Sequence, residues 1–295
     1  MRDIKPTLKL YKPIVSPNIT YIMGHVLRSA VDKRDKISNN PFRNVLEMFR
    51  RYRVRGMEGV KVEINTGQQV YQVTSDDKGY FEVKMKNHAG VMKCFLPDFD
   101  LTQHFTIPAI LEVDKVVVTD IDDTILISHS TSLLKKLYLL LTKNHQRRKA
   151  FEGIEGLYHG LIDKSSLLFY VSSSEWNLYD FLDDFMSFNG LPEGVFLLQD
   201  LKSGIRDLIS SGGGNHSHKK EKIERLIASF PNAEFILIGD SGQKDPVIYQ
   251  SIVDEYPGIV RSVYIRDVRK SRRELFPGLV KYFDSKGVEF QILSK

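Results

Sequence analysis

The sequence contains a single cysteine, Cys94, so no disulfide can form within the chain, and a reducing compartment is expected. The opening residues, MRDIKPTLKLYKPIV, contain no apolar stretch of the kind that a secretory signal needs. The longest apolar run, 133–141, is interrupted by Lys135 and Lys136 and is too short to cross a bilayer. We therefore expect a cytoplasmic protein, or one peripheral to a membrane.

Several ligand-binding patterns are also missing. The glycines at 212–214 fit neither the Walker pattern nor the G-x-G-x-x-G spacing, which argues against a nucleotide-phosphate loop there. His25, His88 and His104 are isolated and more typical of structural histidines than of metal ligands. No RNP-like aromatic platform or helix-turn-helix is visible, so no nucleic-acid partner is expected. The net charge of +5 permits phosphate or anionic membrane partners without selecting one.

The first third of the chain has the pattern of short antiparallel strands. Apolar and polar residues alternate over 60–65 and 80–85, and an Asp/Gly turn lies at 75–79. The stretch T-S-D-D-K-G-Y-F resembles the transthyretin-like small β-domains. We predict a β-sandwich domain over 1–113, with a basic helical insertion near 36–53, that binds a protein or a membrane. The basic segment fits a solvated face as well as a contact with anionic partners.

A different pattern begins at residue 114. Three consecutive valines, 116–118, indicate a strand buried on both faces, as in a parallel sheet covered by helices. Asp120, Asp122 and Thr124 follow it, and ligand sites of such sheets lie outside the carboxyl ends of the strands. Carboxylates this close repel one another unless a divalent cation offsets them. The alternative is an Asx-rich turn or helix cap.

Two later strands end in complementary groups. The apolar run 167–171 leads to Ser172 and Ser173, whose hydroxyls could bind phosphate oxygens or cap a helix. The apolar run 235–238 leads to Asp240 and, five residues on, Asp245. Independent Asx turns have no reason to follow this order, so the three strand ends together predict one reaction centre.

Basic residues flank the same predicted sheet edge. A helix with apolar positions at 223, 226 and 227 begins near Lys219 and Lys220, and either lysine could reach the acids. Arg266 ends the predicted strand 260–266 and is a candidate substrate contact, and a helix is predicted over 269–276, with Arg272 and Arg273 on a solvated face. The basic, leucine-rich segment 133–149 is typical of a helix packed on the protein's own core, or of one lying on a membrane surface.

The order D-x-D-x-T, strand-Ser, Lys and G-D-x4-D resembles the haloacid dehalogenase superfamily of phosphohydrolases. More narrowly, D-I-D-D-T-I, Y-V-S-S-S-x-W-N-L-Y and I-L-I-G-D-S-G-Q-K-D-P resemble the actin-patch-associated phosphatidate phosphatase family, over about 114–285. One departure is Glu175, where the resemblance leads to proline. The resemblance implies a Rossmann-like α/β fold over 114–295, with a parallel sheet and a minimal cap, preceded by the small antiparallel β-sandwich.

The resemblance also implies roles for the residues at the strand ends. Asp120 would be the nucleophile that forms an aspartyl-phosphate, and Asp122 the acid/base. Mg²⁺ would be held by Asp120, the Asp122 backbone carbonyl and Asp240, with Asp245 supporting its water shell or orienting Lys219. Substrate-binding residues would be Thr124, Ser172, Ser173, Lys219 and Arg266.

The resemblance implies a Mg²⁺-dependent phosphomonoesterase that acts on a phosphatidate-like phospholipid at a membrane surface. The spacing leaves no room for a full cap domain, and an uncapped site admits bulky substrates. A phosphoprotein phosphatase fits the same expectation. A non-catalytic membrane or cytoskeletal adaptor is the alternative from another class, although the intact set of acids argues against it.

Overall fold

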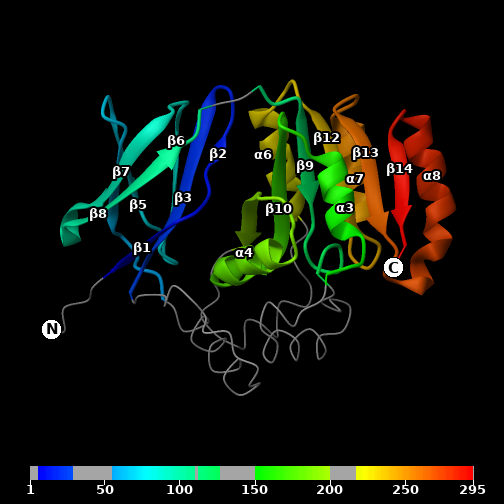
Figure 1. Cartoon of the computed structure of the whole chain (residues 1–295), viewed down its shortest axis with the longest axis horizontal. Coiled ribbons are helices and arrows are strands. Elements are labelled where there is room, and N and C mark those ends of the chain that lie inside the picture. Colours follow the sequence, from blue (N-terminus) through cyan, green and yellow to red (C-terminus); the bar gives the residue numbers. More distant parts are fainter. Residues whose placement is uncertain (1–5, 29–54, 110–111, 127–149, 200–216, 295) are drawn as a thin grey trace, which may run out of the picture.

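The computed structural model describes residues 6–28, 55–109, 112–126, 150–199 and 217–294, which form three β-sheets and the helices around one of them (Figure 1). The strands are β1 Thr7–Leu10, β2 Ile14–Val15, β3 Ile19–Leu27, β4 Lys61–Asn65, β5 Val70–Thr74, β6 Tyr80–Lys86, β7 Gly90–Leu96, β8 Leu101–Ile107, β9 Lys115–Thr119, β10 Ser166–Glu175, β11 Val195–Gln199, β12 Glu234–Asp240, β13 Val260–Arg266 and β14 Glu289–Leu293. The α-helices are α3 Ile154–Leu161, α4 Tyr179–Phe188, α6 Ser217–Ser229, α7 Asp245–Glu255 and α8 Phe276–Ser285, and short 3₁₀ helices cover Pro97–Phe99, Trp176–Leu178 and Lys270–Leu275.

The second part of the chain is built on a six-stranded parallel sheet in the order β11-β10-β9-β12-β13-β14. Its central strand β9 carries Val116, Val117 and Val118, all fully buried or nearly so. A strand between two layers of helices buries both of its faces, which explains why these residues show no polar alternation. The order reverses between β9 and β12, as in doubly wound folds. The predicted Rossmann-like parallel sheet is confirmed.

Helices cover both faces of this sheet. Because crossovers between parallel strands are right-handed, the connections that run from β9 toward β11 and those that run from β12 toward β14 lie on opposite faces. Accordingly α3 and α4 lie in front of the sheet in Figure 1, with α6 and α7 behind it. Ile223 and Leu226 of α6 and Ile252 of α7 are fully buried, so each helix turns its apolar stripe to the sheet.

The first part of the chain forms two antiparallel sheets. One has the order β1-β3-β2 with β6 paired to β3, and the other has the order β5-β4-β7-β8. Alternate residues of β4, such as Val62 and Ile64, are fully buried in a core shared with Met92 and Cys94 of β7. The predicted antiparallel β-sandwich ahead of the α/β part is confirmed, while its boundary at residue 113 stays a prediction.

Strand β3 links the two parts because it is buried on both faces. Ile22 and Val26 join the core of the β-sandwich, whereas Tyr21, Met23 and Leu27 belong to the same core as the parallel sheet. Successive side chains of a strand point to opposite faces, so this one strand serves two cores. The β-sandwich is therefore packed against the α/β part along an apolar face.

Polar and aromatic contacts reinforce this interface. Tyr11 stacks on Trp176 with ring centroids 4.1 Å apart. The guanidinium of Arg225, on α6, lies 3.9 Å from the ring centroid of Tyr21 and donates to the Glu82 carboxylate at 2.9 Å. Tyr11 of the β-sandwich thus packs against Trp176, which directly follows β10.

Some predictions differ from the structure or fall outside it. The segment 269–276, expected as one helix, is a 3₁₀ helix followed by α8, and β14 was not expected. The basic insertion at 36–53 and the whole leucine-rich segment 133–149 lie outside the described residues. The minimal cap stays a prediction because 127–149 and 200–216 are not described. Across the described ranges, none of the helices has the length and apolar character that a membrane span requires.

Candidate active site

The site lies at the carboxyl edge of the parallel sheet, where the strand order reverses. Strands β9 and β12 pair side by side, with Thr119 aligned to Ile238. Asp120 directly follows β9, and its backbone N–H donates to the Ile238 carbonyl at 2.9 Å. Strand β12 itself ends in Asp240. The two strands therefore deliver two carboxylates to neighbouring positions, at the switch point where ligands of such sheets bind.

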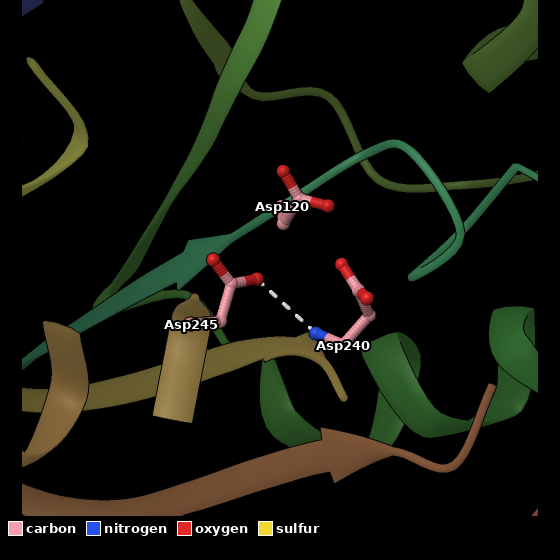
Figure 2. A group of neighbouring side chains, drawn as sticks. All are labelled: Asp120, Asp240 and Asp245. Carbon is pink, nitrogen blue, oxygen red and sulfur yellow. Dashed lines mark hydrogen bonds between the residues drawn. The ribbon is translucent and has the colours of Figure 1, made fainter. Parts of the chain in front are cut away.

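Three carboxylates face a shared space at this point (Figure 2). One oxygen from each of Asp120, Asp240 and Asp245 lies within 4.8 Å of the others. Their exposed fractions are 2%, 0% and 1%. Asp245 starts α7 and accepts a hydrogen bond from the Asp240 backbone N–H at 3.1 Å, which fixes the two acids to each other. The sequence-predicted metal residues Asp120, Asp240 and Asp245 are thus brought together.

Lys219 is the cation of this cluster. Its Nζ lies 2.9 Å from Asp120 Oδ1 and 2.5 Å from Asp245 Oδ1, and α6 supplies it from the first turn. Lys220, the alternative from the sequence, instead pairs with Glu255 at 2.5 Å. The structure therefore brings Lys219, and not Lys220, to the acids.

Burial dominates the electrostatics of the cluster. It raises the pKa of Asp120 to about 7, against the lowering effect of the Lys219 ammonium. It also raises the pKa of Asp240, with further contributions from Asp245 and Asp120. Burial alone would lower the pKa of Lys219, but Asp120 and Asp245 outweigh it and raise that pKa. Three carboxylates thus share one ammonium, and the excess negative charge is costly without another cation.

The hydrogen bonds of Asp240 also indicate that the cluster fits a divalent metal ion. Asp240 Oδ1 accepts hydrogen bonds from the backbone N–H groups of Gly242 at 2.5 Å and Gln243 at 2.9 Å. Asp240 Oδ2 is buried and has no hydrogen-bond partner among the described residues. A buried oxygen without a partner is unfavourable unless it binds an ion, and carboxylate oxygens are the ligands that Mg²⁺ prefers. The residues present therefore suit such an ion.

A tight loop after β9 holds Asp120 in place. The backbone N–H groups of Ile125 and Leu126 both donate to the Ile121 carbonyl at 3.0 Å, and Asp123 adopts a positive φ of 60°. Aspartate tolerates this left-handed conformation better than most residues. The loop turns Thr124 back, and its Oγ1 donates to Asp120 Oδ2 at 3.2 Å. Both oxygens of Asp120 are thereby oriented, one by Thr124 and one by Lys219.

Asp122 lies apart from the acid cluster, although only one residue separates it from Asp120. Its Oδ2 accepts a hydrogen bond from Ser174 Oγ at 3.2 Å, and its backbone carbonyl accepts one from Gln243 Nε2 at 3.3 Å. The Ser172 hydroxyl accepts the Ser174 backbone N–H at 2.9 Å. The two predicted catalytic carboxylates thus sit in different surroundings.

The remaining predicted residues lie at the same edge. Ser173 is half-buried in β10 between the two buried serines. Arg266 ends β13 and is 3% exposed; its Nε donates to the Thr124 carbonyl at 2.8 Å and its Nη1 to the Ser294 carbonyl at 3.0 Å. The first bond holds the loop that carries Thr124, and the second ties Arg266 to the residue after β14, so Arg266 stabilises the loop next to the site.

Three residues at the site were not singled out from the sequence. Ser174 and Gln243 both bond to Asp122, and Arg272, expected on a solvated face, donates to the backbone carbonyls of Ser241 at 3.3 Å and Gln243 at 2.5 Å. Ser174 could have been found, because a strand period of two places it on the same face as Ser172. Arg272 could not, because its partners are backbone atoms that leave no trace in the sequence.

The similarity to known proteins covers the part of the chain that carries these residues. The profile of the family described as phosphatidate phosphatase APP1, catalytic domain, matches residues 115–267, just over half of the chain. Phosphatidate phosphatase APP1 of Saccharomyces cerevisiae is 26% identical over 151 residues, which are 51% of this chain and 25% of the yeast protein. An uncharacterized protein of Schizosaccharomyces pombe is 24% identical over 156 residues, 52% of this chain and 25% of that protein.

The similarity to these relatives is therefore confined to part of each protein. The chain spans about a quarter of the length of the two yeast proteins. Among solved structures, a HAD family hydrolase from Salmonella enterica serovar Typhi is 12% identical with a TM-score of 0.28, over 57% of this chain and 72% of that one, a likeness too low to carry an argument. The matched region begins with β9 and ends just beyond Arg266, so it contains every strand that delivers a residue to the acid cluster. The chain belongs to the phosphatidate phosphatase APP1 catalytic domain family.

Proposed function

We propose that the protein is a Mg²⁺-dependent phosphomonoesterase that hydrolyses a phosphatidate-like lipid through an aspartyl-phosphate. The observation that carries this proposal is the cluster of Asp120, Asp240, Asp245 and Lys219, in which a carboxylate suited to attack lies beside a metal-like set of acids and one ammonium. An Asx turn or helix cap would not gather four charged groups from four elements in a buried site. Family membership supports the same reaction class.

In this proposal Asp120 attacks the phosphorus atom of the substrate. One Asp120 oxygen forms a bond to phosphorus while the bond from phosphorus to the ester oxygen breaks, and the leaving alkoxide takes a proton from Asp122. Water then attacks the same phosphorus, Asp122 takes its proton, and phosphate leaves Asp120. The hydrogen bond from Thr124 and the ion pair with Lys219 hold Asp120 in a single orientation for both steps.

The charge of the reacting phosphoryl group is met by the chain's own donors and by the metal. Lys219 supplies an ammonium beside Asp120, and Ser172 supplies a buried hydroxyl at the end of β10. Mg²⁺, held by Asp120, Asp240 and the backbone carbonyl of Asp122, would offset the excess negative charge and neutralise a phosphate oxygen. Asp245 fixes Lys219 at 2.5 Å and Asp240 through its backbone N–H, so it connects the two halves of the site.

The lipid substrate is supported by the family and by one of the relatives. The relative in Saccharomyces cerevisiae is named a phosphatidate phosphatase. The short spacing between the sequence motifs leaves no room for a full cap domain, and a site without one admits a lipid head group presented at a membrane. We propose a cytoplasmic protein that acts at the membrane surface, with the β-sandwich as the part that meets the membrane or a protein.

A phosphate-release screen tests the function. The purified full chain with Mg²⁺ is expected to release phosphate from phosphatidate in mixed micelles faster than from sugar phosphates or phosphopeptides. Removal of Mg²⁺ with EDTA should abolish release, and Asp120→Asn should lower it by a factor of about 10³ or more. Asp254→Asn, the same change at an exposed acid on α7, is the matched control.

The other functions predict other results in this screen. A preference for phosphopeptides would indicate that the substrate is a phosphoprotein and not a lipid. Binding to anionic liposomes without any phosphate release would favour the adaptor and contradict the proposal.

A further inference from the structure

Ser174 is a buried hydroxyl for which the proposed reaction has no role. It is 6% exposed, and its Oγ donates to Asp122 Oδ2 at 3.2 Å. The two residues are 52 positions apart in the chain. They meet because β9 and β10 pair in parallel and both continue past the sheet edge on the same side.

Ser174 is itself held from two directions. Its backbone N–H donates to the Ser172 hydroxyl at 2.9 Å, which ties it to the end of β10. Two residues later Trp176 is 6% exposed and stacks on Tyr11 of the β-sandwich. These contacts fix the backbone on both sides of Ser174, so its side chain is held where the hydroxyl can reach Asp122.

The two catalytic carboxylates are held by different residues. Asp120 accepts hydrogen bonds from the Lys219 ammonium and the Thr124 hydroxyl, whereas Asp122 Oδ2 accepts one from the Ser174 hydroxyl. Removal of the Ser174 hydroxyl therefore acts on Asp122 and leaves these contacts of Asp120 in place.

We propose that Ser174 is a positioning residue that keeps the Asp122 carboxyl aimed at the leaving oxygen of the substrate. This inference rests on the proposed function, because it assigns to Asp122 the acid step of the phosphatase reaction. Its consequence is specific: loss of the Ser174 hydroxyl impairs the step in which a proton is transferred to the leaving group, and spares the steps that need no such proton.

Leaving-group dependence separates this role from a merely structural one. Phosphatidate releases an alkoxide, which must be protonated as it leaves, whereas p-nitrophenyl phosphate releases a stabilised phenolate without help. The value of kcat/KM reports the steps up to the first irreversible one, which here is the formation of the aspartyl-phosphate. Ser174→Ala should lower kcat/KM for phosphatidate by about 10- to 100-fold and for p-nitrophenyl phosphate by less than about threefold.

A matched control and a rescue variant accompany this measurement. Ser229 is likewise 6% exposed, but its hydroxyl donates to the Arg225 carbonyl within α6, and Ser229→Ala should change neither substrate's kcat/KM. Ser174→Thr keeps the hydroxyl and should restore most of the phosphatidate activity. In an Asp122→Asn background, Ser174→Ala should have no further effect on phosphatidate, because the two residues act through one proton.

The outcomes distinguish this proposal from the proposed function. If the unaltered protein hydrolyses neither substrate, the proposed function fails. If it hydrolyses both, and Ser174→Ala lowers both equally or neither, only the role of Ser174 is overturned. A full additional loss from Ser174→Ala in the Asp122→Asn background, or no rescue by Ser174→Thr, also overturns it.

Discussion

The Asp240→Asn variant separates two effects of this buried acid: the free energy that burial of its charge costs the folded protein, and its contribution to metal binding. The Asp240 Oδ1 atom accepts the backbone N–H groups of Gly242 and Gln243, and an asparagine carbonyl can accept the same two bonds. The Oδ2 atom, which is buried without a hydrogen-bond partner among the described residues, becomes an amide NH₂ that cannot ligate a cation. The substitution therefore preserves the loop and removes one metal ligand.

Without metal, we expect the variant to be the more stable protein. Burial raises the pKa of Asp240 above its unfolded value. An acid with a raised folded pKa opposes folding at every pH above its unfolded value of about 4, and the penalty grows as pH rises toward the folded value. Asparagine lacks this penalty. The metal-free variant should gain on the order of 1 kcal/mol or more at pH 8, because each pKa unit of the shift corresponds to about 1.4 kcal/mol, and little at pH 4.

With Mg²⁺ the order should reverse. A ligand at 100 times its Kd stabilises the folded protein by about 2.7 kcal/mol. For a protein of this size about 1 kcal/mol corresponds to roughly 2–4 °C in Tm, so saturating Mg²⁺ should raise the Tm of the unaltered protein by about 5–10 °C. The Tm of Asp240→Asn should rise by less than about 2 °C at the same concentration.

Thermal unfolding of both proteins in EDTA and in a Mg²⁺ series, followed by circular dichroism, checks this prediction. Asp254→Asn is the control, because this exposed acid on α7 pairs with Lys286 at 2.7 Å and lies outside the cluster. A Mg²⁺ shift as large in Asp240→Asn as in the unaltered protein would refute the metal assignment. A lower Tm for metal-free Asp240→Asn at pH 8 would refute the electrostatic reasoning.

Two further predictions follow from neighbouring ion pairs. Lys219→Ala should lower kcat by about 10²- to 10³-fold, because it removes the cation beside Asp120, while Lys220→Ala should stay within about threefold; equal losses would contradict the geometry. Arg225→Ala should lower the free energy of unfolding by about 1–3 kcal/mol in urea, because it removes the cation that pairs with the part-buried Glu82 and packs on Tyr21 across the β-sandwich interface; a change below about 0.5 kcal/mol would mean that this contact is not part of the stable interface.

The parallel sheet could be predicted from the sequence because its signals are local. The run of valines at 116–118 and the similar runs before Ser172 and Asp240 show no alternation of apolar and polar residues. Such uninterrupted apolar runs are typical of strands that are covered on both faces. The strand β14 was missed, since Glu289–Leu293 lies at the sheet edge and is half-exposed, and a short strand of this kind has no distinctive pattern.

The two-sided burial of β3 could not be predicted either. Its residues from Thr20 to Leu27 are buried without exception, yet the sequence T-Y-I-M-G-H-V-L reads as one strand of a separate domain. Only the tertiary structure shows that Tyr21 and Met23 join the core of the α/β part. The relation between the two parts depends on packing between distant segments, which no local pattern records.

The candidate site was predictable in its acids and less so in its supports. Each predicted carboxylate follows a recognisable strand, and topology alone brings Asp120 and Asp240 to one edge. The sequence could not decide between Lys219 and Lys220, because the start of a helix can be predicted only to within a residue or two. The structure shows that Lys219 is the one that reaches the acids. The contacts of Ser174 and Arg272 depend on loop geometry and required the structure.

The central claim is that Asp120 carries the phosphoryl group, and one measurement tests it most directly. In Asp122→Asn, p-nitrophenyl phosphate should still react, because its phenolate leaves without a proton, whereas hydrolysis of the aspartyl-phosphate lacks its base. Rapid mixing with Mg²⁺ should give a burst of about one phenolate per protein, and mass spectrometry after an acid quench should find the phosphoryl group on Asp120. With the unaltered protein active, the absence of both a burst and a modified Asp120, or an undiminished burst in Asp120→Asn/Asp122→Asn, would contradict the account.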